Sequence, residues 1–426
     1  MYLDYVKILE EELVPATGCT EPIAIALAAA KAREMLHCEP EKMQVLCSRN
    51  IFKNTRSVTV PNSNGLIGIK AAAILGALGG KPYLGMEVIS EVEPDQVEQT
   101  QALVEGQFCE VGLLESDIDL HIQVEMFKGP DSALVEIKHT HTNITLIKKN
   151  GQIFFQQQDD SGNYLGTFVD RSILSVARIY EFANEVDLAD VRPMIEPQIE
   201  YNSAIADYGI NRKLAVGLGQ LILQRHPDDD YEKARAYASA ASEARMTGCP
   251  FPVVTNSGSG NQGITCSVPL ISLAKSWGAS EEELIRTLVF SNLLTIHQKS
   301  GIGRLSAFCG AISAAISAGA GMTYLKGGSL KQINWTISNI MANIPGVICD
   351  GAKSSCAAKI ASGLDAAILG HQLAMQSSKY YEMSGILQSD IEVLIRNVGK
   401  IAKQGMAETD QVIMDLIVND NVQNSG

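Results

Sequence analysis

The sequence predicts an α+β protein. An α/β domain with a mostly antiparallel sheet, residues 40–165, is expected beside a larger all-α domain rich in Ala and Gly, residues 1–39 and 170–426. Two observations predict this division. Short runs rich in β-branched and aromatic residues gather between about 40 and 160, among them MQVLCS, SVTV, DLHIQVEMF and ALVEIKH, and such runs are typical of strands. Beyond about 170 the strand patterns nearly vanish, and long helical runs follow one another.

The first elements are two helices. Residues 3–13 have amphipathic spacing, and a second helix is expected to begin at Thr20, with Pro22 in its first turn. Within the sheet region, residues 65–80 form a Gly/Ala-rich helical run. Asn150-Gly151 marks a hairpin turn between NITLIKK and QIFFQQQ. The sheet region is therefore expected to contain both strands and helix.

The helical half contains many separate runs with visible starts and stops. One of them, residues 305–325, has no charge and is long enough to cross a bilayer. Fourteen of its 21 residues are Ala, Gly, Ser, Thr or Cys, which gain little from lipid. We therefore predict a buried central helix there. The helical runs are expected at 171–185, 195–207, 211–225, 230–246, 262–276, 281–298, 304–320, 330–343, 352–375, 388–405 and 408–419.

The composition limits the classes of function. Apolar residues make up 46% of the 426 residues and charged residues 19%, which is enough apolar sequence for large cores. The net charge of −14 would repel phosphate backbones and anionic lipid. We therefore expect neither a nucleic-acid nor a membrane partner. The acidic N-terminus shows no export signal, so a cytoplasmic location is expected, and the size is compatible with a homodimer.

Four segments combine glycine, small polar residues and reactive side chains. They are PATGCTEP (15–22), NSGSGNQG (256–263), GRLSAFCG (303–310) and GVICDGAKSSC (346–356). The second has three glycines and two serines ahead of an apolar helical run. Such a turn directs backbone N–H groups at an anion, although an ordinary Gly-rich connection is the alternative. It is not a nucleotide P-loop, because Gly-Lys-Ser/Thr is missing.

The nine cysteines are scattered and odd in number, which does not indicate a disulfide framework. Cys19 and Cys349 stand just ahead of expected helix starts, and Cys309 stands in the first turns of a helix. Helix N-termini stabilise thiolates and bound anions. No CxxC pair is present, so neither a zinc ribbon nor a ferredoxin pattern applies. From spacing alone, buried structural thiols are favoured over a metal site.

The motifs change this weighting. In order, PATGCTEPIAIALAAA, NSGSGNQGI, GRLSAFCG and GVICDGAKSSCA closely resemble the L-cysteine desulfidase family, whose bacterial members were formerly an uncharacterised protein family. The resemblance also covers NIFKN…VTVPN (50–62) and HTNI (141–144), and extends to near residue 420. More distantly, the chain is similar to iron–sulfur L-serine dehydratases. Those enzymes pair an α/β domain with a helical catalytic domain.

The resemblance implies a [4Fe–4S] cluster held by three cysteines. An iron left open by the protein reacts with oxygen, so loss of the cluster in air is expected. Carried over by motif, the ligands are Cys19, Cys309 and Cys349, and Cys356 is the substitute for Cys349 or a thiol behind the ligands. Three thiolates leave one iron open, which can act as a Lewis acid on a leaving group. The implied reaction is β-elimination of L-cysteine to sulfide, ammonia and pyruvate.

The other site residues are assigned roles less directly. Lys53 and Asn54 lie in a family-like motif and are candidate catalytic contacts, together with His141 and Arg304. His141 is a candidate base by type, with a structural strand histidine as the alternative. Arg304, like its neighbour Lys299, is a candidate for the substrate carboxylate. The Gly-rich loop is predicted to bind substrate through Asn256, Ser257, Gly258, Ser259, Gly260 and Asn261.

Three alternatives remain at this point. One is an L-serine or L-threonine dehydratase of the same iron–sulfur type. Another is a non-catalytic protein that uses the cluster to sense a metabolite. The third is a pyridoxal-phosphate enzyme, for which Lys353 in DGAKSS is the nearest imitation of a Schiff-base lysine, without a phosphate-binding loop beside it.

Overall fold

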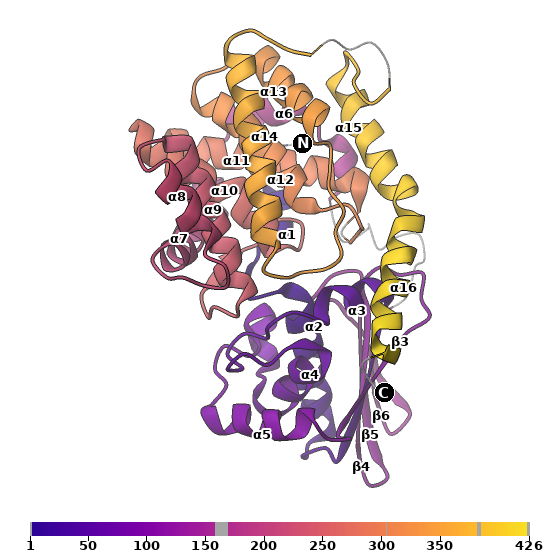
Figure 1. The fold of residues 1–426 in the computed structure, drawn as a ribbon. Coiled ribbons are helices and arrows are strands. Elements are labelled where there is room, and N and C mark those ends of the chain that lie inside the picture. The colour runs from indigo at the N-terminus through magenta and orange to yellow at the C-terminus, as the bar shows by residue number, and fades with distance from the viewer. Residues whose placement is uncertain (1, 158–168, 304, 381–384, 424–426) are drawn as a thin grey trace.

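The computed structural model describes residues 2–157, 169–303, 305–380 and 385–423, and it consists of two parts (Figure 1). The sheet part, residues 18–157, is a twisted sheet with helices against one face. The helical part comprises residues 2–17 and the chain from 169 onward. Together they form the predicted α+β fold.

The sheet is mostly antiparallel, as predicted. Its strand order is β3-β2-β4-β5-β6-β7, and only the β2–β3 pair is parallel. The elements of the sheet part are α2 (Thr20–Leu36), β2 (Lys42–Cys47), α3 (Arg49–Thr55), α4 (Gly68–Gly79), the 3₁₀ helix η1 (Pro82–Glu87), α5 (Pro94–Val104), β3 (Cys109–Leu113), β4 (His121–Lys128), β5 (Asp131–Lys138), β6 (Ile144–Lys149) and β7 (Gln152–Gln156).

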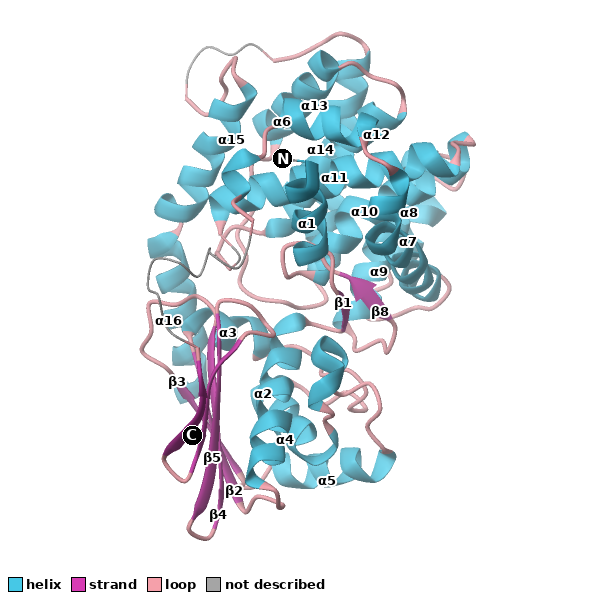
Figure 2. Cartoon of the chain, turned by 180° about the vertical axis from the view of Figure 1, so that it is seen from behind, coloured by secondary structure: helices cyan, strands magenta, loops and turns pink. Residues whose placement is uncertain are grey.

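Buried β-branched residues hold the sheet against its helices. Val45, Val124, Val135 and Ile147 pair across four neighbouring strands, and all are buried. Such cross-strand rows are what stabilises a sheet face. Helices α2 and α4 cover this face (Figure 2). The strand β3 was not predicted, and the predicted run SVTV forms only an isolated bridge from Thr59 to Ile67.

Helix α2 contributes to the core of the sheet part, although residues 1–39 were expected to belong with the helices. Its Ala- and Ile-rich surface is buried almost all round, against α4, β4 and β5. A Cβ on Gly76 of α4 would lie 2.4 Å from the carbonyl oxygen of Ala26. The two helices therefore approach closely because small residues face each other. Only α1, at the start of the chain, joins the core of the helical part.

The helical part surrounds one central helix, α12. It contacts α10, α11, α13 and α14 on all sides and is buried along most of its length, as predicted for residues 305–325. The elements of the helical part are α1 (Tyr2–Glu12), the 3₁₀ helix η3 (Arg171–Ile173), α6 (Val176–Glu185), α7 (Leu188–Ile210), α8 (Leu218–Arg225), α9 (Asp230–Met246), α10 (Gly260–Trp277), α11 (Glu281–Ile302), α12 (Gly310–Leu325), α13 (Leu330–Asn343), α14 (Cys356–Met375), α15 (Ile391–Lys400), the π-helical turn η4 (Ile401–Gly405) and α16 (Ala407–Gln423).

Some helix ends differ from the sequence expectation. Helix α7 is longer than the predicted 195–207: it begins at Leu188, and its packed core face tolerates Pro193 inside the added turns. Helix α8 begins only at Leu218, after Gly217 in the left-handed conformation with φ +71°. Within the described ranges, no helix has both the length and the apolarity needed to cross a membrane.

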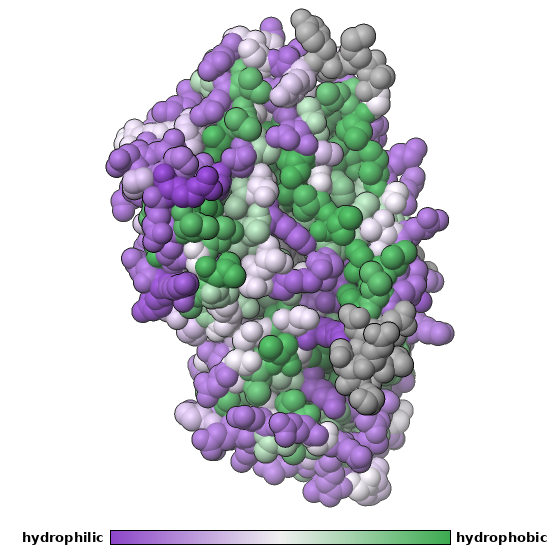
Figure 3. Space-filling model, viewed as in Figure 1, coloured by the Kyte–Doolittle hydropathy of each residue, from purple (hydrophilic) through white to green (hydrophobic). Residues whose placement is uncertain are grey.

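Two connections join the parts. At the first, β1 (Pro15–Thr17) contacts η1 of the sheet part and pairs antiparallel with β8 (Pro252–Val254) within the helical part. Helix α16 runs from the helical part along the sheet part (Figure 1), where its Asp410 forms an ion pair with Lys53 of α3. The surface in the view of Figure 3 mixes polar and apolar side chains over both parts. The two parts therefore contact each other both at β1 and at the ion pair between Lys53 and Asp410. The side chains that lie between these two contacts can be held in fixed positions.

Candidate functional site

A cavity lies between the two parts, and four cysteines line it. They are Cys19, Cys309, Cys349 and Cys356. Three are buried, and Cys349 is partly buried. The sheet part contributes Cys19 and the helical part contributes the other three. Residues that are remote in the sequence therefore meet at one place.

The local structure explains how these thiols are positioned. Cys19 precedes the first turn of α2, Cys309 precedes that of α12, and Cys356 is the first residue of α14. The segments around Cys309 and Cys349 pair with each other. The Cys309 N–H donates to the Val347 carbonyl at 2.9 Å, and the Cys349 N–H donates to the Ala307 carbonyl at 2.7 Å. This short antiparallel pairing sets the two thiols side by side.

The four thiols differ in acidity. Because the Cys309 thiol donates a hydrogen bond to Cys349, the pKa of Cys349 falls to about 6, while the pKa of Cys309 is raised. The nearby Lys359 also favours a thiolate at Cys349. Burial raises the pKa of Cys19 to about 12, and burial also raises the pKa of Cys356. Cys349 is therefore the thiol that ionises most readily.

Glycines next to two of the cysteines permit close backbone contacts. Gly18 has φ +65°, and a Cβ there would lie 2.0 Å from a ring carbon of Pro61. Gly351 has φ +104°, and a Cβ there would lie 2.6 Å from the carbonyl oxygen of Lys53. Both positions need glycine for conformation and for space. The glycines of the GCTEP and CDGA motifs thus hold the cysteine segments against the sheet part.

The chemistry of the donor set is compatible with an iron–sulfur cluster. The described residues contain no group of three or more His, Cys, Asp or Glu side chains arranged to hold one ion. A [4Fe–4S] cube does not need ligands that converge on one point, because each cysteine binds a different iron. Four thiols around one cavity, three of them at helix N-termini, supply suitable ligands and a favourable field for an anionic cluster.

The Gly-rich loop lies at the same cavity, but not all of its residues face it. Ser257, Gly258, Ser259 and Asn261 line the cavity. Asn256 does not, because its buried amide donates to Asn292 Oδ1 at 2.9 Å. Gly260 likewise does not line it: its α-carbon faces the Arg245 side chain.

The predicted catalytic residues separate into three groups. Asn54 and His141 line the cavity. Lys53 does not; its buried ammonium group forms an ion pair with Asp410. Arg304 lies outside the described residues. Lys299 lines the cavity and is buried.

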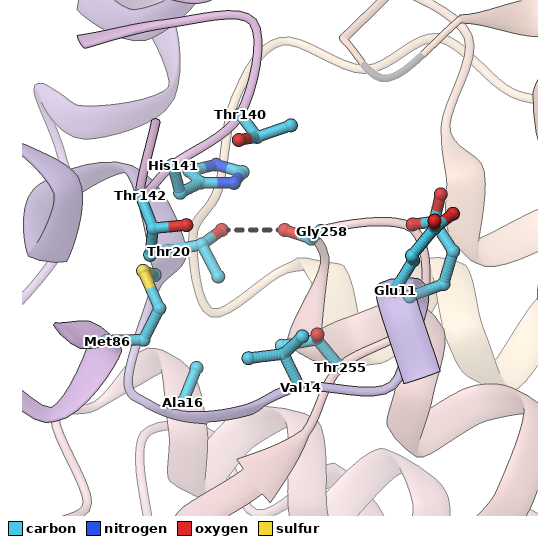
Figure 4. Close-up of a pocket in the computed structure, with 11 residues that line it drawn as sticks. Glu11, Val14, Ala16, Thr20, Met86, Thr140, His141, Thr142, Thr255 and Gly258 are labelled. Carbon is cyan, nitrogen blue, oxygen red and sulfur yellow. Dashed lines mark hydrogen bonds between the residues drawn. The ribbon is translucent and has the colours of Figure 1, made fainter. Parts of the chain in front are cut away.

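A second pocket adjoins the thiol cavity and shares three residues with it. They are Thr20, His141 and Gly258. Figure 4 shows the Thr20 hydroxyl directed at the Gly258 carbonyl, to which it donates at 2.9 Å, with the His141 ring on the same side of the pocket. His141 therefore lies where the Gly-rich loop and the start of α2 meet.

Several further polar residues line the cavity without having been assigned a role from the sequence, and three of them have long side chains. These three are Glu21, Arg245 and Gln262. Glu21 accepts a hydrogen bond from Asn54 Nδ2 at 3.1 Å and another from Thr20 Oγ1 at 3.1 Å. Glu21 and Gln262 stand inside the quoted motifs, so the motifs themselves were the available signal. Arg245 stands near the end of a long helix in no motif, and only packing reveals it.

A family model described as serine dehydratase alpha chain matches residues 83–415, which include Cys309, Cys349 and Cys356. The chain belongs to the serine dehydratase alpha chain family. The predicted similarity to iron–sulfur serine dehydratases is thereby confirmed at the level of the family. The specificity of an L-cysteine desulfidase stays a prediction.

Relatives of the same length extend the likeness to the whole chain. A UPF0597 protein of Lachnoclostridium phytofermentans is 49% identical over 98% of this chain and 100% of its own length. A UPF0597 protein of Fusobacterium nucleatum is 46% identical over 96% of this chain and 97% of its own. Another, from Treponema denticola, is 44% identical over 98% of both chains. These matches include the region of Cys19, which lies ahead of the family model.

Proposed function

We propose that this chain is an iron–sulfur-dependent lyase that removes the β-substituent of a small amino acid, with L-cysteine as substrate. The products would be sulfide, ammonia and pyruvate. The observation that carries the proposal is the meeting of Cys19, Cys309, Cys349 and Cys356 around one cavity. Membership of the serine dehydratase alpha chain family supports β-elimination as the reaction class.

The proposed ligands of a [4Fe–4S] cluster are Cys19, Cys309 and Cys349, with Cys356 as the substitute for Cys349. When bound, a cluster with three protein ligands supplies an open iron as a Lewis acid for the leaving group. Lys359 and the N-termini of α2 and α12 favour negative charge at these thiols.

The side chains of the cavity would hold the substrate and move its proton. The Cα proton of an amino acid is weakly acidic, so a base must lie close to it. We assign this role to His141. Glu21 is another cavity group able to accept a proton, but its Oε1 already accepts a hydrogen bond from Asn54 Nδ2 at 3.1 Å. Loss of the proton and of HS⁻ gives aminoacrylate, which rearranges to an imine that water hydrolyses to ammonia and pyruvate.

L-serine is the second candidate substrate, because the matching family is described by serine dehydration. The two reactions differ in the leaving group. Sulfide is a soft ligand that suits iron, whereas hydroxide is a harder one. We favour L-cysteine because the GCTEP, LSAFCG and VICDGA motifs resemble the desulfidase family more closely.

The proposal is tested on protein purified without oxygen. Iron and acid-labile sulfide are measured together with the visible absorbance, and then sulfide and pyruvate release are followed from L-cysteine and pyruvate release from L-serine. Sulfide release from L-cysteine at the higher kcat/KM supports the proposal. Faster turnover of L-serine would assign the dehydratase reaction instead, and no turnover of either would leave only a cluster-binding sensor.

Cysteine variants test the ligand assignment. Cys309→Ala and Cys349→Ala are expected to remove the visible absorbance, whereas Cys356→Ala is expected to keep most of it. Cys266→Ala is the matched control, because Cys266 is buried in α10 and does not line the cavity. Full iron content in the Cys309 or Cys349 variant would contradict the assignment.

A further inference from the structure

Two polar atoms of the thiol cavity are buried without a partner among the described residues. They are Arg245 Nε and Gln262 Oε1. Each of these residues is only 3% exposed. Burying a polar group without a hydrogen bond is costly, and native proteins rarely leave one unpaired. A donor and an acceptor left open at one cavity therefore indicate a ligand that supplies both complements.

Close packing fixes both side chains at the cavity wall. Arg245 lies over Gly260, where a Cβ would come within 2.3 Å of its Nε. Gln262 lies over Gly310, where a Cβ would come within 2.7 Å of its Cδ. Gly260 is the first residue of α10, and Gly310 is the first of α12, directly after Cys309. Glycine at both helix starts thus makes room for the two polar side chains.

Charge also points to an anionic group at Arg245. Its guanidinium has no ion pair among the described residues, and the cavity carboxylate Glu21 accepts hydrogen bonds from Asn54 and Thr20 instead. A guanidinium presents several N–H donors in a fork that matches a carboxylate. A buried guanidinium facing a cavity is suited to recognise one.

We infer that Arg245 and Gln262 form a clamp for the two charged ends of an α-amino acid, an inference that rests on the proposed function for the class of substrate. The Arg245 guanidinium donates to the α-carboxylate. Gln262 Oε1 accepts from the α-ammonium group. The clamp would hold the backbone atoms of the substrate and leave its β-substituent free to reach the cysteine side of the cavity. Arg245, rather than Lys299 or Arg304, is then the residue that binds the carboxylate.

Three unreactive ligands test the clamp without any turnover. L-alanine carries both charged ends but has no leaving group, L-alaninamide lacks the carboxylate, and propionate lacks the ammonium group. Binding is measured by isothermal titration calorimetry on wild-type protein purified without oxygen. We expect L-alanine to bind more tightly than either of the other two ligands. Equal binding of L-alanine and L-alaninamide to the wild-type protein would overturn the inference, as would no saturable binding of L-alanine.

Variants then assign each end of the ligand to a residue. Arg245→Gln is expected to weaken L-alanine binding on the order of 10- to 100-fold, with little change for L-alaninamide. Gln262→Leu is expected to weaken L-alanine on the order of 10-fold, with little change for propionate. Arg235→Gln is the matched control on the same helix, because Arg235 pairs with Glu232 and Asp365 instead.

The circular dichroism spectrum and the iron content of each variant are also measured. If Arg245→Gln does not fold, Arg245→Lys replaces it, because lysine retains the positive charge but lacks the guanidinium fork. An Arg245→Gln protein that still prefers L-alanine to L-alaninamide by the wild-type factor would refute the clamp. A role of Arg245 in charge balance at the thiols alone would change iron content and leave this preference intact. Clamp-dependent binding without release of sulfide or pyruvate would instead refute the proposed function and keep the clamp.

Discussion

The ion pair between Lys53 of α3 and Asp410 of α16 connects the two parts beside the cavity. Substituting its two partners tests whether Lys53 stabilises the fold or takes part in catalysis. The Lys53 side chain is 1% exposed, whereas that of Asp410 is 23% exposed. Asp410→Asn would leave a buried ammonium group without its counter-charge. Lys53→Met would leave a carboxylate that water can partly hydrate. The two substitutions are therefore expected to have unequal effects.

The magnitudes follow from this difference in exposure. Removing one partner and leaving the other charge buried costs about 3–5 kcal/mol. An ion pair that water reaches contributes only about 0.2–1 kcal/mol. We expect Asp410→Asn to lower the free energy of unfolding by about 3 kcal/mol and Lys53→Met to lower it by about 1 kcal/mol. The double variant should lose less than Asp410→Asn alone, because no charge then remains buried.

The measurement is urea unfolding followed by circular dichroism. Lys31→Met is the control, because its pair with Glu34 on α2 is exposed, and it should change stability by less than about 0.5 kcal/mol. A larger loss from Lys53→Met than from Asp410→Asn would refute the reasoning. A Lys53→Met protein with wild-type stability and no sulfide release would return Lys53 to the catalytic role that the sequence predicted.

Two further outcomes follow from single residues. Burial lowers the pKa of His371 from 6.5 to about 4, so the unfolded chain binds this proton more readily. Stability should therefore fall by up to about 3 kcal/mol as the pH drops from 6.5 to 4, and a series of urea midpoints should show a smaller fall for His371→Gln. At Gly351, with φ +104°, alanine would press on the Lys53 carbonyl, so Gly351→Ala should lower iron content. Gly327→Ala, with φ +70° and open space around it, should retain full iron content; equal content in both variants would contradict this role of Gly351.

Local patterns explain how much of the fold was predictable. Runs rich in β-branched and aromatic residues identified β2, β4, β5 and β6, because strand propensity can be read from neighbours in the sequence. The uncharged run of small residues identified α12 as buried, because this pattern too can be read from consecutive residues alone. Helix α7 was predicted to start too late, because Pro193 is unfavourable to a helix locally, whereas tertiary packing keeps the helix intact through it.

The parts of the candidate site that lie in short sequence motifs were predictable from the sequence. The segments around Cys19, Cys309, Cys349 and Cys356 were identified from their glycines and cysteines, and all four thiols line one cavity. Lys53 stood in an equally good motif, yet its partner is Asp410, more than 300 residues later in the chain. No local pattern could reveal that contact.

By itself the sequence determined the α+β class and the small-residue central helix. It also named the candidate ligands, which are Cys19, Cys309 and Cys349 with Cys356 as the substitute. The tertiary structure alone decided that these thiols share a cavity, that Lys53 pairs with Asp410 instead of lining it, and that Arg245 Nε and Gln262 Oε1 at its wall have no partner among the described residues. The physical reason is that secondary structure follows from contacts between near neighbours in the chain. A buried site depends instead on which distant surfaces exclude water together, and that is settled only when the helices and the sheet pack.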